Sequence, residues 1–290
     1  MKISLPKICH DLKGFEALVS LWVKTKDCEF DDIQIDMKAV TWFDADMCAA
    51  LGAILYRLGA DLNTVKLENI SPKVENILSK NAFLCHYGRE KIPDTYGTTI
   101  PYQRFDAKDD RFFAGYIETE LIHRSEMPTM SLGLLKKFRE SIFEIFSNAV
   151  LHSRTELGIF SCGQFFPKKH RLDFSVADLG IGILKNVKEH TGIDFSPEDS
   201  IKWSTEGSNT TKRSSIPGGL GLKLLMEFID LNDGCIQIVS DAGYWRRENR
   251  KTFVRRLGQS FPGTVVSVEI NTADMQSYAL SSEFLKTDIF

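Results

Sequence analysis

The sequence predicts an α/β protein built from two domains. Its 290 residues exceed the usual length of one compact domain, and strand-like alternation of apolar residues takes turns with amphipathic helical periodicity along the chain. Hydrophobic residues make up 43% and charged residues 26%, which is typical of a folded globular chain. We expect an N-terminal α/β domain over residues 1–87, a connecting segment over 88–130, a C-terminal α/β domain over 131–270 and a tail over 271–290.

The N-terminal domain is predicted from an ordered series of strands and helices. Residues 33–37 alternate apolar and polar side chains as a strand does, and residues 65–70 form a second strand-like run. A further helix begins after Ser71, which suits the N-cap position, with Pro72 in its first turn. Between the two strands lies an amphipathic helix whose apolar residues recur every three or four positions: Cys48, Leu51, Leu55 and Leu58. The connecting segment that follows is rich in aromatic residues, so we expect it to pack against one or both domains.

Charge and cysteine usage exclude several classes of protein. The net charge of −3 gives no overall attraction to nucleic acid or to an anionic membrane. The chain begins with no signal peptide and contains no run of about 18 apolar residues, so we expect a cytoplasmic protein without a membrane span. The six cysteines form no CxxC pair and are expected to be reduced, although the neighbours Cys9-His10 and Cys85-His86 leave a shared zinc open.

The first motif with chemical meaning is a helix over residues 140–152. Its apolar residues predict one buried face, while Glu144, Asn148 and His152 form a separate polar stripe at four-residue intervals. The Asn148 oxygen is a hard ligand suited to Mg²⁺, and the Glu144 carboxylate could deprotonate a nucleophile. An ordinary solvated polar stripe explains the same pattern.

The second motif is an alternating strand that ends in Asp178 and continues into a turn with Gly180 and Gly182. A carboxylate at the end of a strand can accept a hydrogen bond from an exocyclic amine such as that of adenine. Glycines beside it allow the backbone to approach a flat ring closely. A plain glycine turn after a strand is the alternative.

The third motif is the glycine-rich run 217–223, which opens onto a helix. Glycines at a helix start present free backbone N–H groups and the positive end of the helix dipole, which together attract phosphate. The run has neither the GxxxxGK[ST] pattern of a P-loop nor the preceding strand of a Rossmann fingerprint. The polar stretch 203–215 before it has the composition of a mobile lid.

In this order the three motifs resemble the nucleotide-binding boxes of the GHKL superfamily, also called the Bergerat fold. Residues 144–152 have the form Glu-x-x-x-Asn-Ala-x-x-His that is found in anti-sigma serine kinases, and the strand-like run 262–270 opens with Gly263-Thr264 as family members do. The resemblance covers residues 131–270. It implies an α/β sandwich in which helices cover one face of a mixed sheet, with ATP and Mg²⁺ as ligands.

The resemblance also implies a role for each matching residue. Glu144 would be the catalytic base, Asn148 would hold Mg²⁺, and Asp178 would read the adenine amine. The remaining residues would bind or shape the nucleotide pocket: Gly180, Gly182, Lys212, Gly219, Gly221 and Thr264. Lys212 in particular, with its neighbour Arg213, is a candidate cation for the γ-phosphate.

The N-terminal domain resembles the STAS fold of anti-anti-sigma factors. The matching segments are IDMKAVTWFDADMCAAL and VKLENISPKVENILSKNAF, in the order strand, helix, strand, helix. Asp46 falls where that family has a phosphorylatable serine, and its carboxylate would imitate part of the charge of a phosphoserine. The favoured alternative is that Asp44 and Asp46 cap the following helix.

Two functions are compatible with these motifs. The first is a signalling or regulatory enzyme that hydrolyses ATP or transfers its γ-phosphate to a protein serine or threonine. The alternative is an ATP-gated protein-binding switch with little or no catalysis. Another protein is the expected partner, bound through the STAS-like domain, and a homodimer is also compatible. Nucleic acid is an unfavoured partner, because the basic segment Arg246–Arg256 is expected to be a solvated hairpin.

Overall fold

A computed structural model describes residues 1–206 and 220–284. The N-terminal part alternates three strands and three helices, and its strands form a parallel sheet in the order β1-β2-β3. The predicted strands and helices of this part are confirmed, whereas β1 and α1 were not predicted. The elements are β1 (Lys2–Ser4), α1 (Leu12–Thr25), β2 (Asp32–Asp36), α2 (Cys48–Ala60), β3 (Thr64–Glu68) and α3 (Pro72–Lys80), with 3₁₀ turns at Ala45–Met47 and Phe83–Tyr87.

The larger sheet has five strands in the order β4-β6-β7-β9-β8, and every neighbouring pair is antiparallel. The expectation of a mixed sheet is therefore wrong. The chain reverses through short connections between β6 and β7 and between β8 and β9, and such reversals make the joined strands antiparallel. The strands are β4 (Thr99–Phe105), β6 (Ile159–Phe166), β7 (Arg171–Asp178), β8 (Cys235–Glu248) and β9 (Lys251–Asn271).

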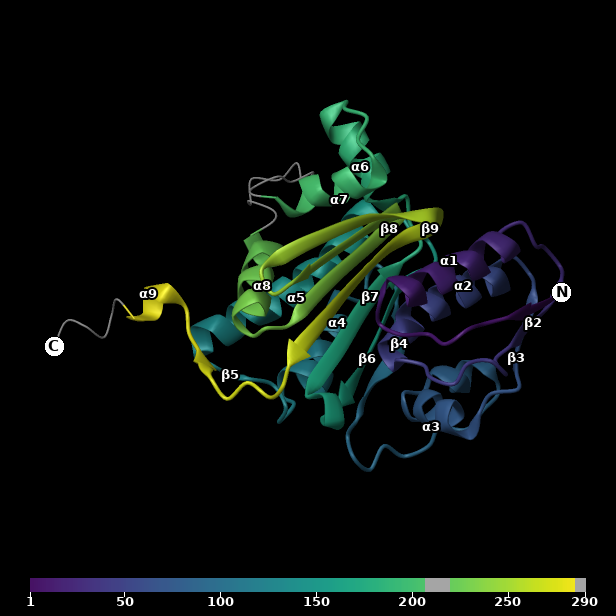
Figure 1. Ribbon diagram of the computed structural model, residues 1–290, viewed down its shortest axis with the longest axis horizontal. Helices are drawn as coiled ribbons and strands as arrows, with labels where there is room; N and C mark the ends of the chain where they lie inside the picture. Colours follow the sequence, from purple (N-terminus) through teal and green to yellow (C-terminus); the bar gives the residue numbers. More distant parts are fainter. Residues whose placement is uncertain (207–219, 285–290) are drawn as a thin grey trace.

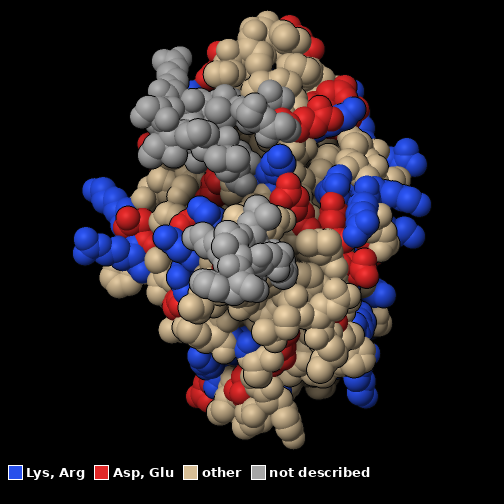
Figure 2. Space-filling model, turned by 90° about the vertical axis from the view of Figure 1, so that its left-hand side faces the viewer, with Lys and Arg blue, Asp and Glu red and all other residues tan. Residues whose placement is uncertain are grey.

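The basic segment Arg246–Arg256 forms the far end of the β8–β9 hairpin, as predicted. Its two-residue turn is Asn249-Arg250, and both residues have left-handed backbone angles, with φ of 51° and 61°. Such a turn matches the natural twist of a hairpin. On the face that Figure 2 shows, acidic and basic side chains are interspersed, and no field of one sign covers the described residues.

One face of the five-stranded sheet is covered by helices of the C-terminal part (Figure 1). Leu172, Phe174 and Val176 of β7 point to this face and share a core with α4, α5 and α8. The helices are α4 (Asp110–Ile117), α5 (Leu132–His152), α6 (Gly182–Thr191), α7 (Pro197–Thr205) and α8 (Leu220–Leu231), with a π-helical turn at Glu118–Ile122 and a 3₁₀ turn at Pro167–Lys169.

The expected helices lie on the first face, and the opposite face of the same sheet is covered by the N-terminal part, which the sequence did not predict (Figure 1). Phe15 of α1 packs with Tyr244, and Leu257 and Phe261 of β9 belong to the same core as α1 and α2. Burying two apolar sheet faces requires two covering layers. The N-terminal part is the second layer.

The predicted connecting segment 88–130 does more than link the two parts. It supplies the edge strand β4 and the helix α4, whose Phe113 stacks on Phe146 of α5. The predicted tail contains β10 (Ser277–Tyr278) and the single helical turn α9 (Ser281–Phe284). Strand β10 pairs in parallel with β5 (Thr129–Met130). No helix among the described residues is both long and apolar enough to cross a bilayer.

Candidate functional site

A pocket of about 1060 Å³, measured with its open mouth, lies between α5 and the sheet, with α6, α7 and α8 at its rim. Five predicted site residues line it: Glu144, Asn148, Asp178, Gly182 and Thr264. Gly180 and Gly221 do not line the pocket, but their N–H groups donate hydrogen bonds to the lining residues Asp178 and Glu144, respectively. Lys212 and Gly219 lie outside the described residues.

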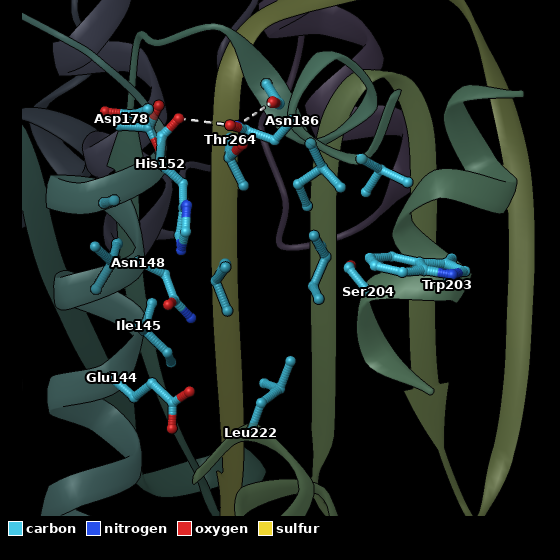
Figure 3. A pocket seen from close by; sticks show the side chains of 18 of the residues that line it. Glu144, Ile145, Asn148, His152, Asp178, Asn186, Trp203, Ser204, Leu222 and Thr264 are labelled. Carbon is cyan, nitrogen blue, oxygen red and sulfur yellow. Dashed lines mark hydrogen bonds between the residues drawn. The ribbon is translucent and has the colours of Figure 1, made fainter. Parts of the chain in front are cut away.

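Helix α5 presents the polar stripe to the pocket. Its N-terminus is capped by the Ser131 hydroxyl, which accepts a hydrogen bond from the Leu134 N–H at 3.1 Å. The predicted apolar face is buried against the sheet. Glu144, Asn148 and His152 form a separate stripe that projects into the pocket between α5 and the strands (Figure 3).

Asp178 ends β7 at the same end of the pocket as His152 (Figure 3). Only 4% of its surface is exposed, and this burial raises the pKa of its carboxyl group to about 7. The Gly180 N–H donates a hydrogen bond to Asp178 Oδ1 at 2.8 Å. Thr264 lies opposite Asp178 on β9, so the two strands bring both residues to one wall.

The turn after Asp178 has a structural reason for glycine at position 182. Gly182 has φ of 74°, in the left-handed region that other residues avoid, and a Cβ there would lie 2.4 Å from Asp241 Oδ2. Asp241 in turn accepts a hydrogen bond from the Leu184 N–H at 3.2 Å. The glycine thus fixes where α6 starts against β8.

Glu144 reaches across the pocket to the first turn of α8. Its Oε2 accepts a hydrogen bond from the Gly221 N–H at 2.9 Å, and a Cβ at position 221 would lie 2.2 Å from the same oxygen. This N–H belongs to the run expected to bind phosphate. A carboxylate already occupies the anion-attracting start of this helix.

The structure also adds lining residues that sequence reasoning missed. Asn186 donates hydrogen bonds to the carbonyls of His152 and Gly182, both at 2.8 Å, and so joins the end of α5 to the start of α6 (Figure 3). Its spacing of four residues from Gly182 could have indicated the same helix face. Trp203 and Ser204, at the start of the expected lid 203–215, belong to helix α7 and stand opposite α5. The lid residues from 207 onward lie outside the described residues.

Asp44 and Asp46 do not cap the helix after them, so that interpretation is wrong. Neither side chain makes a capping hydrogen bond to α2. Asp46 instead contacts His10 and Ser175 in the buried interface between the N-terminal part and the sheet. Burial alone would lower the pKa of His10, but the charges of Asp46 and Asp173 outweigh it and raise that pKa to about 9.

The pocket thus combines a buried carboxyl group at one end with a carboxylate, a carboxamide and a helix N-terminus at the other. This suits an elongated ligand with a hydrogen-bonding ring and an anionic tail. No protein-family model matches the chain, and no curated protein matches it either. The interpretation of the pocket therefore rests on its residues and their geometry.

Proposed function

We propose that the pocket binds ATP with Mg²⁺ and that the protein is a GHKL-type signalling or regulatory protein. The reaction is hydrolysis of ATP or transfer of its γ-phosphate to a serine or threonine of a protein. One observation carries the proposal: three separate segments, the helix 140–152, the strand that ends at Asp178 and the strand-like run 262–270, contribute Glu144, Asn148, Asp178 and Thr264 to a single pocket.

The two ends of the pocket suit the two ends of ATP. Asp178 and Thr264 offer acceptors to an adenine amine, beside a floor of apolar residues such as Val176 and Ile238. Glu144 lies eight residues before His152 on α5, which places it about 12 Å further along the helix axis. The phosphates would therefore lie near Glu144 and the start of α8.

Asn148 fits the metal that accompanies ATP. Its carboxamide oxygen is a hard donor, one helical turn from Glu144 and on the same side of α5. Bound Mg²⁺ would neutralise phosphate charge. Glu144 would then accept the proton of the attacking water or hydroxyl group, after phosphates displace it from the Gly221 N–H.

An ATP-gated protein-binding switch is the second candidate, and the position of the N-terminal part favours it. β7 and β9 present Asp178 and Thr264 to the pocket, while Ser175 and Ser267 of the same strands face the N-terminal part. A ligand that shifts these strands would alter that interface. In this mode the ATP-bound state would set the affinity for a partner protein, and turnover would be slow or absent.

Asp178→Asn is expected to weaken ATP binding by at least about 1.5 kcal/mol, a typical value for a charge-assisted hydrogen bond. The asparagine keeps the size of the side chain but replaces the acceptor that the adenine amine needs with a mixed donor and acceptor. Isothermal titration calorimetry with a non-hydrolysable ATP analogue measures the change. Asp194→Asn is the control, because it makes the same chemical change at an aspartate that is 79% exposed and does not line the pocket. Equal affinity of wild type and Asp178→Asn would rule out the adenine placement.

ATP affinity is expected to rise between pH 6 and pH 8, with a midpoint near 7. The buried carboxyl group of Asp178 has a pKa of about 7, and its ionised form is the stronger acceptor for an amine. Raising the pH through this value therefore creates the form that binds, by up to roughly tenfold per pH unit below the midpoint. The protonation of ATP itself also changes with pH, but it affects wild type and Asp178→Asn equally, so the comparison of the two proteins isolates the contribution of Asp178. The proposal predicts a steeper pH dependence in wild type, and identical profiles would contradict it.

A further inference from the structure

A second cluster of chemically capable side chains lies on the opposite face of β7 from the pocket residues. His10 Nδ1 lies 2.5 Å from Asp46 Oδ2 and 3.8 Å from Asp173 Oδ2, and all three side chains have 0% exposure. His10 and Asp46 come from the N-terminal part, and Asp173 comes from the five-stranded sheet. One potential ligand atom from each residue lies within 4.8 Å of the other two.

Buried polar atoms without hydrogen-bond partners are concentrated at this cluster. Among the described residues, five of the seven such side-chain atoms belong to it or to the adjoining Arg171: His10 Nε2, Asp46 Oδ1, both oxygens of Asp173 and Arg171 Nε. Buried polar groups almost always have partners, and a group of exceptions in one place points to an ion or water that binds there.

The charges of the cluster point to a cation. Four acidic side chains meet in this buried interface, and Arg171 pairs with three of them: Asp44, Asp173 and Glu269. A cation bound among them would offset the cost of burying these carboxylates together. The four carboxylates are those of Asp44, Asp46, Asp173 and Glu269.

We propose that His10, Asp46 and Asp173 bind one Zn²⁺ ion that joins the N-terminal part to the sheet. Imidazole nitrogen and carboxylate oxygen are both zinc ligands, and three protein ligands leave a fourth position for a water molecule or a neighbouring hydroxyl group. Mg²⁺ suits the site less, because it keeps several water ligands and these side chains are fully buried. On binding, the Nδ1–H proton that His10 shares with Asp46 passes to solvent, and the nitrogen lone pair coordinates the metal.

The surrounding residues hold the carboxylates in place, as outer partners of metal ligands do. The Ser175 hydroxyl donates to Asp46 Oδ2 at 2.9 Å and pairs with the Ser267 hydroxyl at 2.7 Å. Arg171 lies 3.1 Å from Asp173 Oδ2. This site uses no residue of the ATP pocket, so its test is independent of the proposed function.

The test is zinc stoichiometry after refolding. The full chain is unfolded in denaturant with a chelator, refolded with one equivalent of Zn²⁺, passed through a desalting column and analysed for metal by mass spectrometry. We expect one bound zinc per chain and a thermal midpoint roughly 5 °C above that of the chelated protein. Asp173→Asn, which preserves side-chain size, is expected to reduce zinc affinity at least about 100-fold, more than loss of an outer partner does.

Two controls keep the result interpretable. The double variant Cys85→Ser, His86→Ala removes the second Cys-His pair, which lies outside this cluster, and should leave the stoichiometry unchanged. Circular dichroism verifies that Asp173→Asn is folded, and Asp46→Asn replaces it if it is not. Wild type that retains no zinc, or zinc retained equally by the folded Asp→Asn variant, would show that the cluster is an ion-pair network only and overturn the proposal.

Discussion

Glu144→Gln is expected to lower phosphate release or transfer from ATP by roughly 10²- to 10⁴-fold, the usual contribution of a general base. Glutamine has nearly the same shape but cannot accept the proton of the attacking nucleophile. ATP binding should stay at least as tight, because the substitution removes a negative charge from the Gly221 N–H and from the expected phosphate position. In this variant, turnover should therefore fall while ATP affinity is retained.

The measurement is incubation of purified protein with γ-labelled ATP and Mg²⁺, followed by separation of free phosphate from labelled protein. Free phosphate indicates hydrolysis, and a labelled protein substrate indicates transfer. Glu140→Gln is the control, because Glu140 lies one turn earlier on α5, is half exposed and pairs with Lys137 at 2.7 Å. If Glu144→Gln turns over ATP as fast as wild type, Glu144 is not the base. Tight ATP binding by wild type without any label movement would favour the switch.

Arg171→Met is expected to reduce the free energy of unfolding by about 3–5 kcal/mol, the usual cost of removing one partner from a buried ion pair. The guanidinium lies 3.2 Å from Asp44, 3.1 Å from Asp173 and 3.1 Å from Glu269, and the side chain is only 18% exposed. Methionine retains the apolar stem but leaves three carboxylates without this counter-charge. The interface between the N-terminal part and the sheet should loosen.

Urea unfolding followed by circular dichroism measures this loss. Arg154→Met is the matched control, because Arg154 pairs with Glu189 on the surface, where the two side chains are 56% and 43% exposed. That pair should contribute less than about 1 kcal/mol, as exposed ion pairs do. Equal destabilisation by the two substitutions would mean that the Arg171 network does not stabilise the interface.

Much of the candidate site could be predicted because its elements are local. The spacing of Glu144, Asn148 and His152 predicts one face of a helix from 3.6-residue periodicity alone, and that face lines the pocket. Alternation predicts a strand ending at Asp178, and β7 does end there. Gly182 in the following turn adopts the left-handed angle that makes glycine necessary. Neighbouring residues determine each of these features.

Contacts between distant segments could not be predicted. The Glu144 carboxylate binds an N–H that lies 77 residues away, and the partners of Asp46 are His10, 36 residues before it, and Ser175, 129 residues after it. Hence the helix-cap interpretation of Asp46 failed: the local sequence offers a cap, whereas packing of the N-terminal part on the sheet offers a buried histidine and a serine.

The sequence by itself determined the α/β class, the positions of elements such as α2, α3, α5 and β7, and the residues that share the polar face of α5, because periodicity and turn chemistry act over a few residues. Only the tertiary structure decided that all neighbouring strands of the large sheet are antiparallel and that the N-terminal part covers its second face. Strand pairing and layer packing depend on apolar faces that must be buried together. An apolar residue does not specify which residue it will contact across such a face, because many apolar side chains of similar volume can fill the same position.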